Sequence, residues 1–279
     1  MSSHTTHDLP ARSPLLRALA RPRAIALACI AVLAAAGWIY LGVLLAGESS
    51  QGFLDMLCQP IYGITAVSKG TVALTFAMWC AMVLAMMVPT AGPMIITYAD
   101  IAETAAAKGE PAVSPLVLIA GYITVWLGGA AIFTAVQLLL GGLHILGAGP
   151  TPSSLLLSGA LFLGAGLYQF SALKHACLNK CQHPIPFFFA NWTARSSGVF
   201  RLGLREGFDC LGCCWAMMLL MFAFGVMNVI WMALLGVAMT IEKLDTSLRV
   251  NRALGVIFTL AGIGLLGLAV IAVWPTLTH

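Results

Sequence analysis

Residues 207–225 read GFDCLGCCWAMMLLMFAFG, an apolar stretch in which cysteine and methionine recur at the spacing of an α-helix. A helix advances about 100° per residue, so side chains three and four positions apart share a face. Four sulfur-bearing residues then fall within about 60° of one another, and two more flank them. The four are Cys210, Cys214, Met217 and Met221, and the flanking pair is Cys213 and Met218. The stretch therefore predicts a transmembrane helix with one face of soft metal ligands.

The composition of the whole chain places this stretch in a membrane. Hydrophobic residues make up 60% of the sequence, charged residues make up 9%, and the mean hydropathy is +0.96. Soluble chains carry about 25% charged residues. The apolar runs do not alternate with polar residues, as the strands of a transmembrane barrel would. We therefore predict an all-α, polytopic transmembrane helical bundle whose main partner is the lipid bilayer. The net charge of +4 comes from residues that flank the spans, and it indicates no nucleic acid partner.

Seven apolar runs are candidates for crossing the bilayer, which takes about 20 helical residues. They cover residues 24–46, 71–96, 113–140, 153–173, 207–225, 227–241 and 253–274. The fifth and sixth runs together are too long for one crossing and short for two. Gly225 and Asn228 would supply the turn between them, and without that turn the bundle has six spans. Residues 1–20 form a flexible cytoplasmic tail in this interpretation, and residues 21–279 form one transmembrane domain.

Lysine and arginine predict the orientation, because basic residues close to span ends stay in the cytoplasm. With a cytoplasmic N-terminus, seven spans leave thirteen of the fourteen basic residues inside and only Lys69 outside. The cytoplasmic side would then hold a long loop, residues 174–206, between the fourth and fifth spans. The first span is longer than the apolar core of a cleaved signal peptide, so we expect it to remain as an anchor.

Five of the eight cysteines gather at the cytoplasmic ends of two predicted spans. Cys177 and Cys181 lie one helical turn apart in the loop, and the other three open the fifth span: Cys210, Cys213 and Cys214. The cytoplasm keeps thiols reduced, so the cluster indicates metal binding or redox chemistry rather than structural disulfides. Three cations nearby would favour the thiolate form, namely Lys174, Lys180 and Arg205.

Methionine separates the candidate metals, because thioethers suit copper(I) and are scarcely used by zinc. The second span places Met78, Met82 and Met86 on one face and Met87 on the opposite face. Pro89 follows, and it should kink the helix and leave backbone carbonyls free. Each methionine stripe alone is compatible with ordinary packing. Together with the cysteines they predict a line of ligands for copper(I), with zinc, mercury or an iron–sulfur cluster as alternatives.

Three sulfur motifs and two polar ones carry a resemblance to a known family. The motifs are Trp79-x2-Met82-x2-Ala85-Met86-Met87-x-Pro89, Tyr168-Gln169-x4-Lys174-x2-Cys177-Leu178-x2-Cys181, Gly207-x2-Cys210-x-Gly212-Cys213-Cys214-Trp215-x2-Met218, Gly225-x-Met227-Asn228 and Glu242-Lys243. In these residues the chain resembles a bacterial family of predicted metal-binding integral membrane proteins, a domain of unknown function often labelled copper chaperone. The resemblance covers roughly residues 70–250.

The resemblance implies a multi-pass protein of the bacterial inner membrane with a soft-metal site. The residues it implies as ligands are Met82, Met86, Met87, Cys177, Cys181, Cys210, Cys213 and Cys214, to which the helical spacing adds Met217, Met218 and Met221. We interpret the chain as a copper(I) binding protein that acts in copper transport or in delivery to a copper enzyme, with a copper donor or acceptor protein as partner. No nucleotide-binding loop accompanies these residues, so any movement of metal would follow a gradient or a partner's affinity.

Two other functions fit part of the pattern. Cys210 and Cys213 have the two-residue spacing of disulfide exchange enzymes, so the chain could be a membrane thiol–disulfide oxidoreductase. The adjacent pair Cys213 and Cys214 in a span resembles mercuric ion permeases. The oxidoreductase interpretation leaves the methionines without a role, and we expect a protein that binds metal and is not an enzyme.

Overall fold

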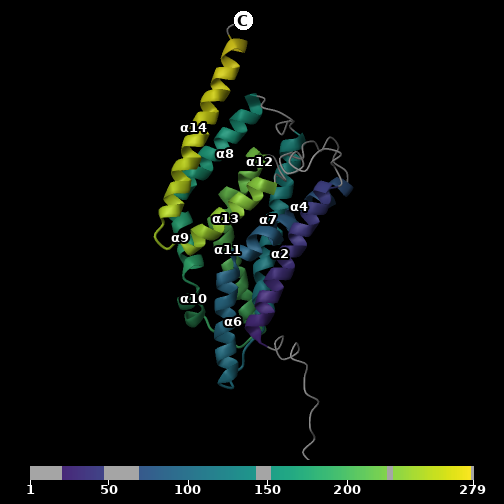
Figure 1. The fold of residues 1–279 in the computed structure, drawn as a ribbon, viewed down its shortest axis with the longest axis vertical. Helices are drawn as coiled ribbons and strands as arrows, with labels where there is room; N and C mark the ends of the chain where they lie inside the picture. The colour runs from purple at the N-terminus through teal and green to yellow at the C-terminus, as the bar shows by residue number, and fades with distance from the viewer. Residues whose placement is uncertain (1–20, 47–68, 143–151, 225–228, 278–279) are drawn as a thin grey trace, which may run out of the picture.

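The computed structural model describes residues 21–46, 69–142, 152–224 and 229–277, and within these ranges the regular structure is helical. The helices form an elongated bundle, with the C-terminal end of the last helix at the opposite end from the start of the first (Figure 1). In chain order they are α2 (Pro22–Ala46), α4 (Lys69–Met82), the π-helix η1 (Val83–Met87), α5 (Val88–Thr90), α6 (Gly92–Ala107), α7 (Pro115–Gly142), α8 (Pro152–Gln169), α9 (Ala172–Gln182), α10 (Pro184–Ala190), α11 (Ser196–Leu219), α12 (Met221–Phe224), α13 (Val229–Leu244) and α14 (Arg249–Leu277).

Five stretches of the described chain are long and apolar enough to cross a membrane. They are Pro22–Val43, Lys69–Thr90, Pro115–Gly142, Ser196–Ala223 and Arg249–Ala272. A sixth results if α8 and α9, which meet at a bend of 64°, count as one broken span. The sequence predicted seven spans, but α13 has 16 residues and is short for a crossing. The turn that we expected at Gly225 and Asn228 lies outside the described residues.

The segment that we expected to be a loop, residues 174–206, is largely helical. It contains most of α9, all of α10 and the first turns of α11, which begins at Ser196 and not at residue 207. The Ser171 side chain caps α9 by accepting from the backbone N–H of Lys174 at 3.1 Å. Pro184 lacks an N–H and disfavours helical backbone at His183, so α9 ends there and α10 starts with the proline in its first turn.

The π-helix η1 lies near the end of the second span, two residues before Pro89. Pro89 has no N–H with which to bond the carbonyl of Ala85, four residues earlier. The Trp38 indole of α2 donates to that carbonyl at 3.1 Å instead. This bond agrees with the prediction that Pro89 frees a backbone carbonyl, and the predicted kink stays a prediction. The freed carbonyl fastens the first span to the second.

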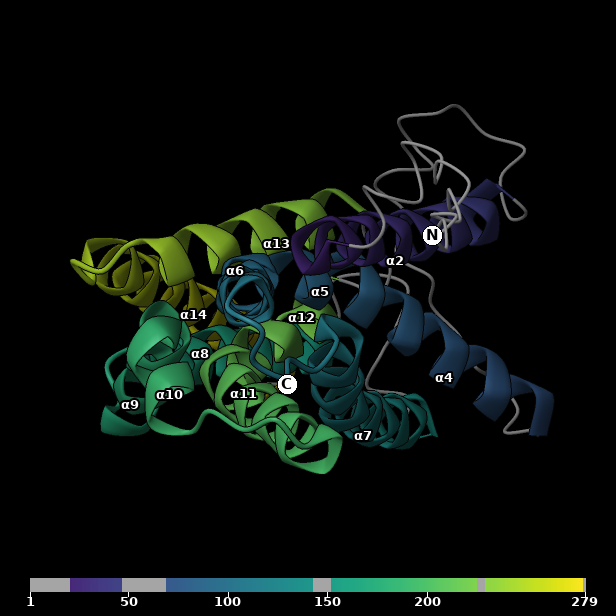
Figure 2. The same cartoon turned by 90° about the horizontal axis from the view of Figure 1, so that it is seen from below.

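Helix α11 lies between α7 on one side and α9 on the other, as the view from below shows (Figure 2). The crossing of α7 and α11 is close because both helices carry glycine there. A side chain at Gly203 would collide with the carbonyl oxygen of Leu118, and one at Gly121 with the carbonyl oxygen of Phe200. Small residues allow backbones in a membrane to approach in this way. The crossing brings the next residue of α7, Tyr122, against α11.

Candidate metal centre

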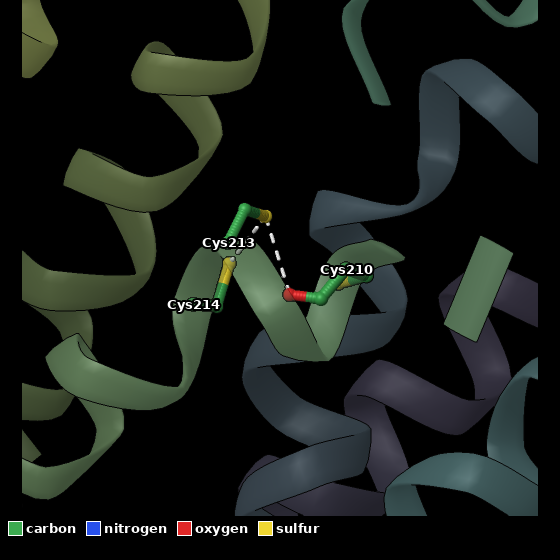
Figure 3. A group of neighbouring side chains, drawn as sticks. All are labelled: Cys210, Cys213 and Cys214. Atoms are coloured by element: carbon green, nitrogen blue, oxygen red, sulfur yellow. Dashed lines mark hydrogen bonds between the residues drawn. The ribbon is translucent and has the colours of Figure 1, made fainter. Parts of the chain in front are cut away.

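Three thiols of α11 form a compact group in the interior of the bundle (Figure 3). The Sγ atoms of Cys210, Cys213 and Cys214 all lie within 4.8 Å of one another. The two sulfurs of Cys213 and Cys214 are 3.3 Å apart, and the Cys213 thiol donates to the backbone carbonyl of Cys210 at 3.2 Å. Their exposed fractions are 2%, 1% and 1%. Helical spacing of three and four residues makes this grouping, as the sequence predicted.

A fourth sulfur comes from α9, which packs against α11. The Cys181 side chain lies near Cys213 but is not one of the three thiols within 4.8 Å of one another. Cys177, one turn earlier on α9, packs against Gly212. A Cβ atom added at Gly212 would lie only 2.6 Å from the Sγ atom of Cys177. Gly212 therefore gives α9 the room to pack this closely. The structure brings Cys181 to the cluster and places Cys177 on the adjoining turn of α9.

A lysine and a tyrosine contact the first cysteine of the cluster. Lys243, in the last turn of α13, donates to Cys210 Sγ at 3.1 Å and to the Thr90 hydroxyl at 2.9 Å. The Tyr122 hydroxyl lies 3.0 Å from the same sulfur and donates to the carbonyl of Met87 at 3.0 Å. An ammonium group beside a sulfur favours the thiolate. Cys210 is thus the cysteine of the group whose sulfur is in contact with a lysine ammonium.

The sequence did not identify Lys243 as the cation beside the thiols and pointed instead to three cations that are closer to them along the chain. Those three have other hydrogen-bond partners: Lys174 pairs with Glu242 at 2.7 Å, Lys180 with Asp209 at 2.9 Å, and Arg205 donates to Asn191 at 3.2 Å. The signal in the sequence was the pair Glu242-Lys243 at the end of an apolar run. A charge in such a place indicates a function, because it is costly to bury.

The same turn of α13 is held by a second buried network. Glu242 accepts from Lys174 at 2.7 Å and from the Asn251 amide at 2.8 Å. Asn251 also donates to Gln169 at 2.8 Å and lies 3.1 Å from the His175 ring. The network therefore joins α8, α9, α13 and α14, and it fixes the position of the lysine that follows Glu242.

All of the methionines proposed as ligands are buried. They are Met82, Met86, Met87, Met217, Met218 and Met221. The Met217 sulfur lies 3.9 Å from the Lys174 ammonium, and Met86 packs beside Gly236 of α13, where an added Cβ would be 3.7 Å from its methyl. Helix α11 packs chiefly on α7 and α9, whereas α4 packs on α7 and α2. The link from η1 to the cluster is the hydrogen-bonded chain from the Met87 carbonyl through Tyr122 to Cys210.

A cavity of about 120 Å³ adjoins the cluster. Two of the four cysteines, Cys181 and Cys210, are in its wall, together with Lys243 and Glu206. Glu206 is 1% exposed, and its Oε1 atom has no hydrogen-bond partner among the described residues. Two sulfurs, one buried ammonium and one buried carboxyl therefore line this small polar space, and Cys213 and Cys214 are not among its lining residues.

Comparison with known proteins gave a match to a family model. A family model described as PpoB2, copper chaperone, matches residues 76–265. The matched range includes the four cysteines of the site, Lys243 and all of the methionines discussed above. No curated protein and no solved structure matched the chain.

Proposed function

This chain belongs to the PpoB2 family of copper chaperones, and on that premise we propose that it binds copper(I) at its buried cysteine cluster. The ion is cargo: the protein holds it within a membrane and carries it across or hands it to a copper enzyme. The observation that carries the proposal is the group of three thiols within 4.8 Å of one another, with a fourth on the neighbouring helix.

The charge of the site supports copper(I) over a divalent metal. Two thiolates and one copper(I) ion carry a net charge of about −1, which the ammonium of Lys243 neutralises. Zinc prefers four ligands, and four thiolates around zinc would leave a net charge of about −1 after the same compensation. An uncompensated charge costs several kcal/mol in an apolar interior. The single buried lysine at Cys210 therefore favours a monovalent soft ion.

The distribution of basic residues supports an N-terminus on the cytoplasmic side of a bacterial inner membrane. The start of α2, the end of α6 and helix α10 lie together at the lower end of the bundle in Figure 1. Arg21, Arg23 and Lys108 belong to these segments, and Arg23 pairs with Asp100 at 3.5 Å. Basic residues remain in the cytoplasm, so we assign this end to that side. The C-terminal end of α14 would then face the opposite compartment.

Burial of the thiols supports metal binding rather than disulfide exchange. An exchange enzyme must let a partner's sulfur attack one of its own sulfurs directly. Cys213 is 1% exposed and is not in the wall of the cavity. A metal ion passed between neighbouring sulfurs needs no such approach. We therefore propose a metal-binding role without catalysis.

The test is elemental analysis of protein purified anaerobically under reducing conditions from cells supplied with copper. Wild-type protein should retain copper, with an X-ray absorption spectrum of copper(I) bound by sulfur. Cys213→Ser and Cys214→Ser should each lose most of it. Cys80→Ser is the matched control, because Cys80 is a partly buried cysteine of α4 outside the cluster, and it should retain copper. Metal-free wild type, or variants with unchanged copper, would refute the proposal.

A further inference from the structure

The four cysteines of the site differ in what they face. Cys181 and Cys210 are in the wall of the cavity, whereas Cys213 and Cys214 are not among its lining residues. Cys181 is partly exposed, and the three cysteines of α11 are buried. Cys181 also lies near Cys213. The four sulfurs are therefore arranged in order of access. The partly exposed Cys181 and the buried Cys210 line the cavity, and Cys213 and Cys214 are buried outside its wall.

The cavity has the polar lining of a site that holds water or a ligand. Glu206 presents a carboxyl oxygen that has no hydrogen-bond partner in the described part of the chain, and Lys243 and Thr90 lie in the same wall. A buried polar atom without a hydrogen bond costs about 1–3 kcal/mol, so such atoms are normally met by water or by a ligand. The volume of about 120 Å³ exceeds the roughly 10–15 Å³ that one water needs. The space has room for an ion with a small attached group.

Its remaining walls come from several helices and from the segment that follows α13. They include Tyr122 of α7, Gln182 of α9, Leu244 at the end of α13, and Thr246. Leu244 and Thr246 are exposed, so this wall reaches the surface beside the last turn of α13. The cavity thus connects the outside of the protein with the cluster.

On the basis of the proposed function, we propose that this cavity is the port through which copper(I) reaches the cluster, and that Cys181 takes the ion from a small-thiol complex. Copper(I) in a reduced compartment is held by thiolates, and a complex with two of them is an anion. The ammonium of Lys243 attracts such an anion into the cavity. A space of about 120 Å³ admits the copper end of a small thiol and excludes a folded polypeptide.

The transfer is ligand exchange, and copper stays in the +1 state throughout. The Cys181 sulfur bonds to the ion as one donor sulfur leaves, and the thiol proton of Cys181 leaves on that donor as free thiol. The thiolate of Cys210 then replaces the second donor, which departs as a thiolate. No electron is transferred, so no oxidant or reductant is required. The ion can afterwards pass to Cys213, which already lies beside Cys181.

If the cavity is the port, loss of the Cys181 thiol should lower the rate of copper uptake much more than the affinity for copper. Protein in detergent is mixed anaerobically with copper(I)–glutathione, and uptake is followed by stopped-flow absorbance of the copper–thiolate band. Equilibrium affinity is measured separately by competition with a copper(I) chelator. Cys181→Ser should slow uptake by about tenfold or more, equivalent to at least about 1.4 kcal/mol in the barrier, while affinity falls far less. Cys80→Ser, on α4 and outside both the cluster and the cavity wall, should leave the rate unchanged.

A second variant tests the port without altering a sulfur. Leu244 is exposed at the rim of the cavity, so Leu244→Trp should fold and should slow uptake from copper(I)–glutathione with little change in affinity. Normal uptake rates in both variants would refute the proposal that copper(I) enters through this cavity. A loss of affinity in Cys181→Ser as large as its loss of rate would refute it as well. Wild-type protein that takes up no copper would instead refute the proposed function, so the two failures are distinguishable.

Discussion

The side-chain nitrogen of Lys243 lies 3.1 Å from the sulfur of Cys210, although 33 positions separate the two residues in the sequence. Within the described residues, no carboxylate lies within ion-pairing distance of Lys243, and its other hydrogen-bond partner is the neutral hydroxyl of Thr90. A buried ammonium needs an anion nearby. The sulfur of Cys210 fills this role before metal arrives, and the metal-bound sulfurs fill it afterwards.

Replacing Lys243 should therefore weaken copper(I) binding. Lys243→Met keeps the length of the side chain and removes its charge. A hydrogen bond to a charged group contributes about 1.5–3 kcal/mol, so affinity in a chelator competition should fall by about 10-fold to 100-fold. Lys180→Met is the control, because Lys180 is exposed and pairs with Asp209. Equal affinities of the two variants would show that Lys243 does not compensate the site's charge.

The ion pair between Lys174 and Glu242 should dominate the stability of the region where α9 meets α13. Both side chains are buried, at 0% and 1% exposure. Lys174→Met leaves Glu242 as an unpaired buried charge, which costs about 3–5 kcal/mol. Unfolding by SDS in mixed micelles should show this loss, and adding Glu242→Gln should restore part of it. In the pair of Lys180 and Asp209 the lysine side chain is 57% exposed, so the pair should contribute at most about 1 kcal/mol and Lys180→Met serves again as control.

The contact between Trp38 and the carbonyl of Ala85 should depend on Pro89. Trp38→Phe removes the indole donor and should cost about 0.5–1.5 kcal/mol for the hydrogen bond. In a Pro89→Ala background, the new N–H of residue 89 can bond the Ala85 carbonyl itself, so Trp38→Phe should cost less. A double-mutant cycle of unfolding free energies measures the difference. Additive effects would mean that the proline is not the reason for the contact.

The glycine crossing of α7 and α11 should be essential to the geometry of the cluster. Gly203→Ala would place a methyl group against the Leu118 carbonyl and push the helices apart. We expect a loss of about 1–3 kcal/mol in stability, together with weaker copper binding, because Tyr122 moves away from Cys210. Gly128→Ala on α7 is the control: its Cβ would meet no atom within 4 Å, and it should be neutral or stabilising by up to about 1 kcal/mol. A Gly203→Ala protein with normal stability would contradict the close crossing.

The sequence predicted the features that depend on local periodicity. Spacing of three and four residues was enough to place Cys210, Cys213 and Cys214 on one buried face of a helix, and a proline was enough to predict free carbonyls near residue 85. These features follow from helix geometry alone. They needed no knowledge of which helices are neighbours.

The features that depend on tertiary contacts were not predictable in the same way. The cations near the thiols in the sequence are paired with carboxylates or with an amide, and the cation in contact with Cys210 lies on α13. The start of α11 at Ser196 was hidden because residues 196–206 include Arg201, Arg205 and Glu206, and these charges lower the hydropathy of the segment. The 64° bend between α8 and α9 also depends on packing, since α9 turns back onto α11.

That bend has a mechanical consequence. Three of the four sulfurs are fixed relative to one another by a single helix, but the fourth is carried by α9, which is attached to α8 only through the short connection at Phe170 and Ser171. The ion pair of Lys174 with Glu242 and the hydrogen bonds from Gln182 to the carbonyls of Glu242 and Asp245 hold α9 on α13. The approach of Cys181 to the three thiols of α11 is therefore set by the packing of separate helices, whereas the grouping of those three thiols is set by the spacing within one helix.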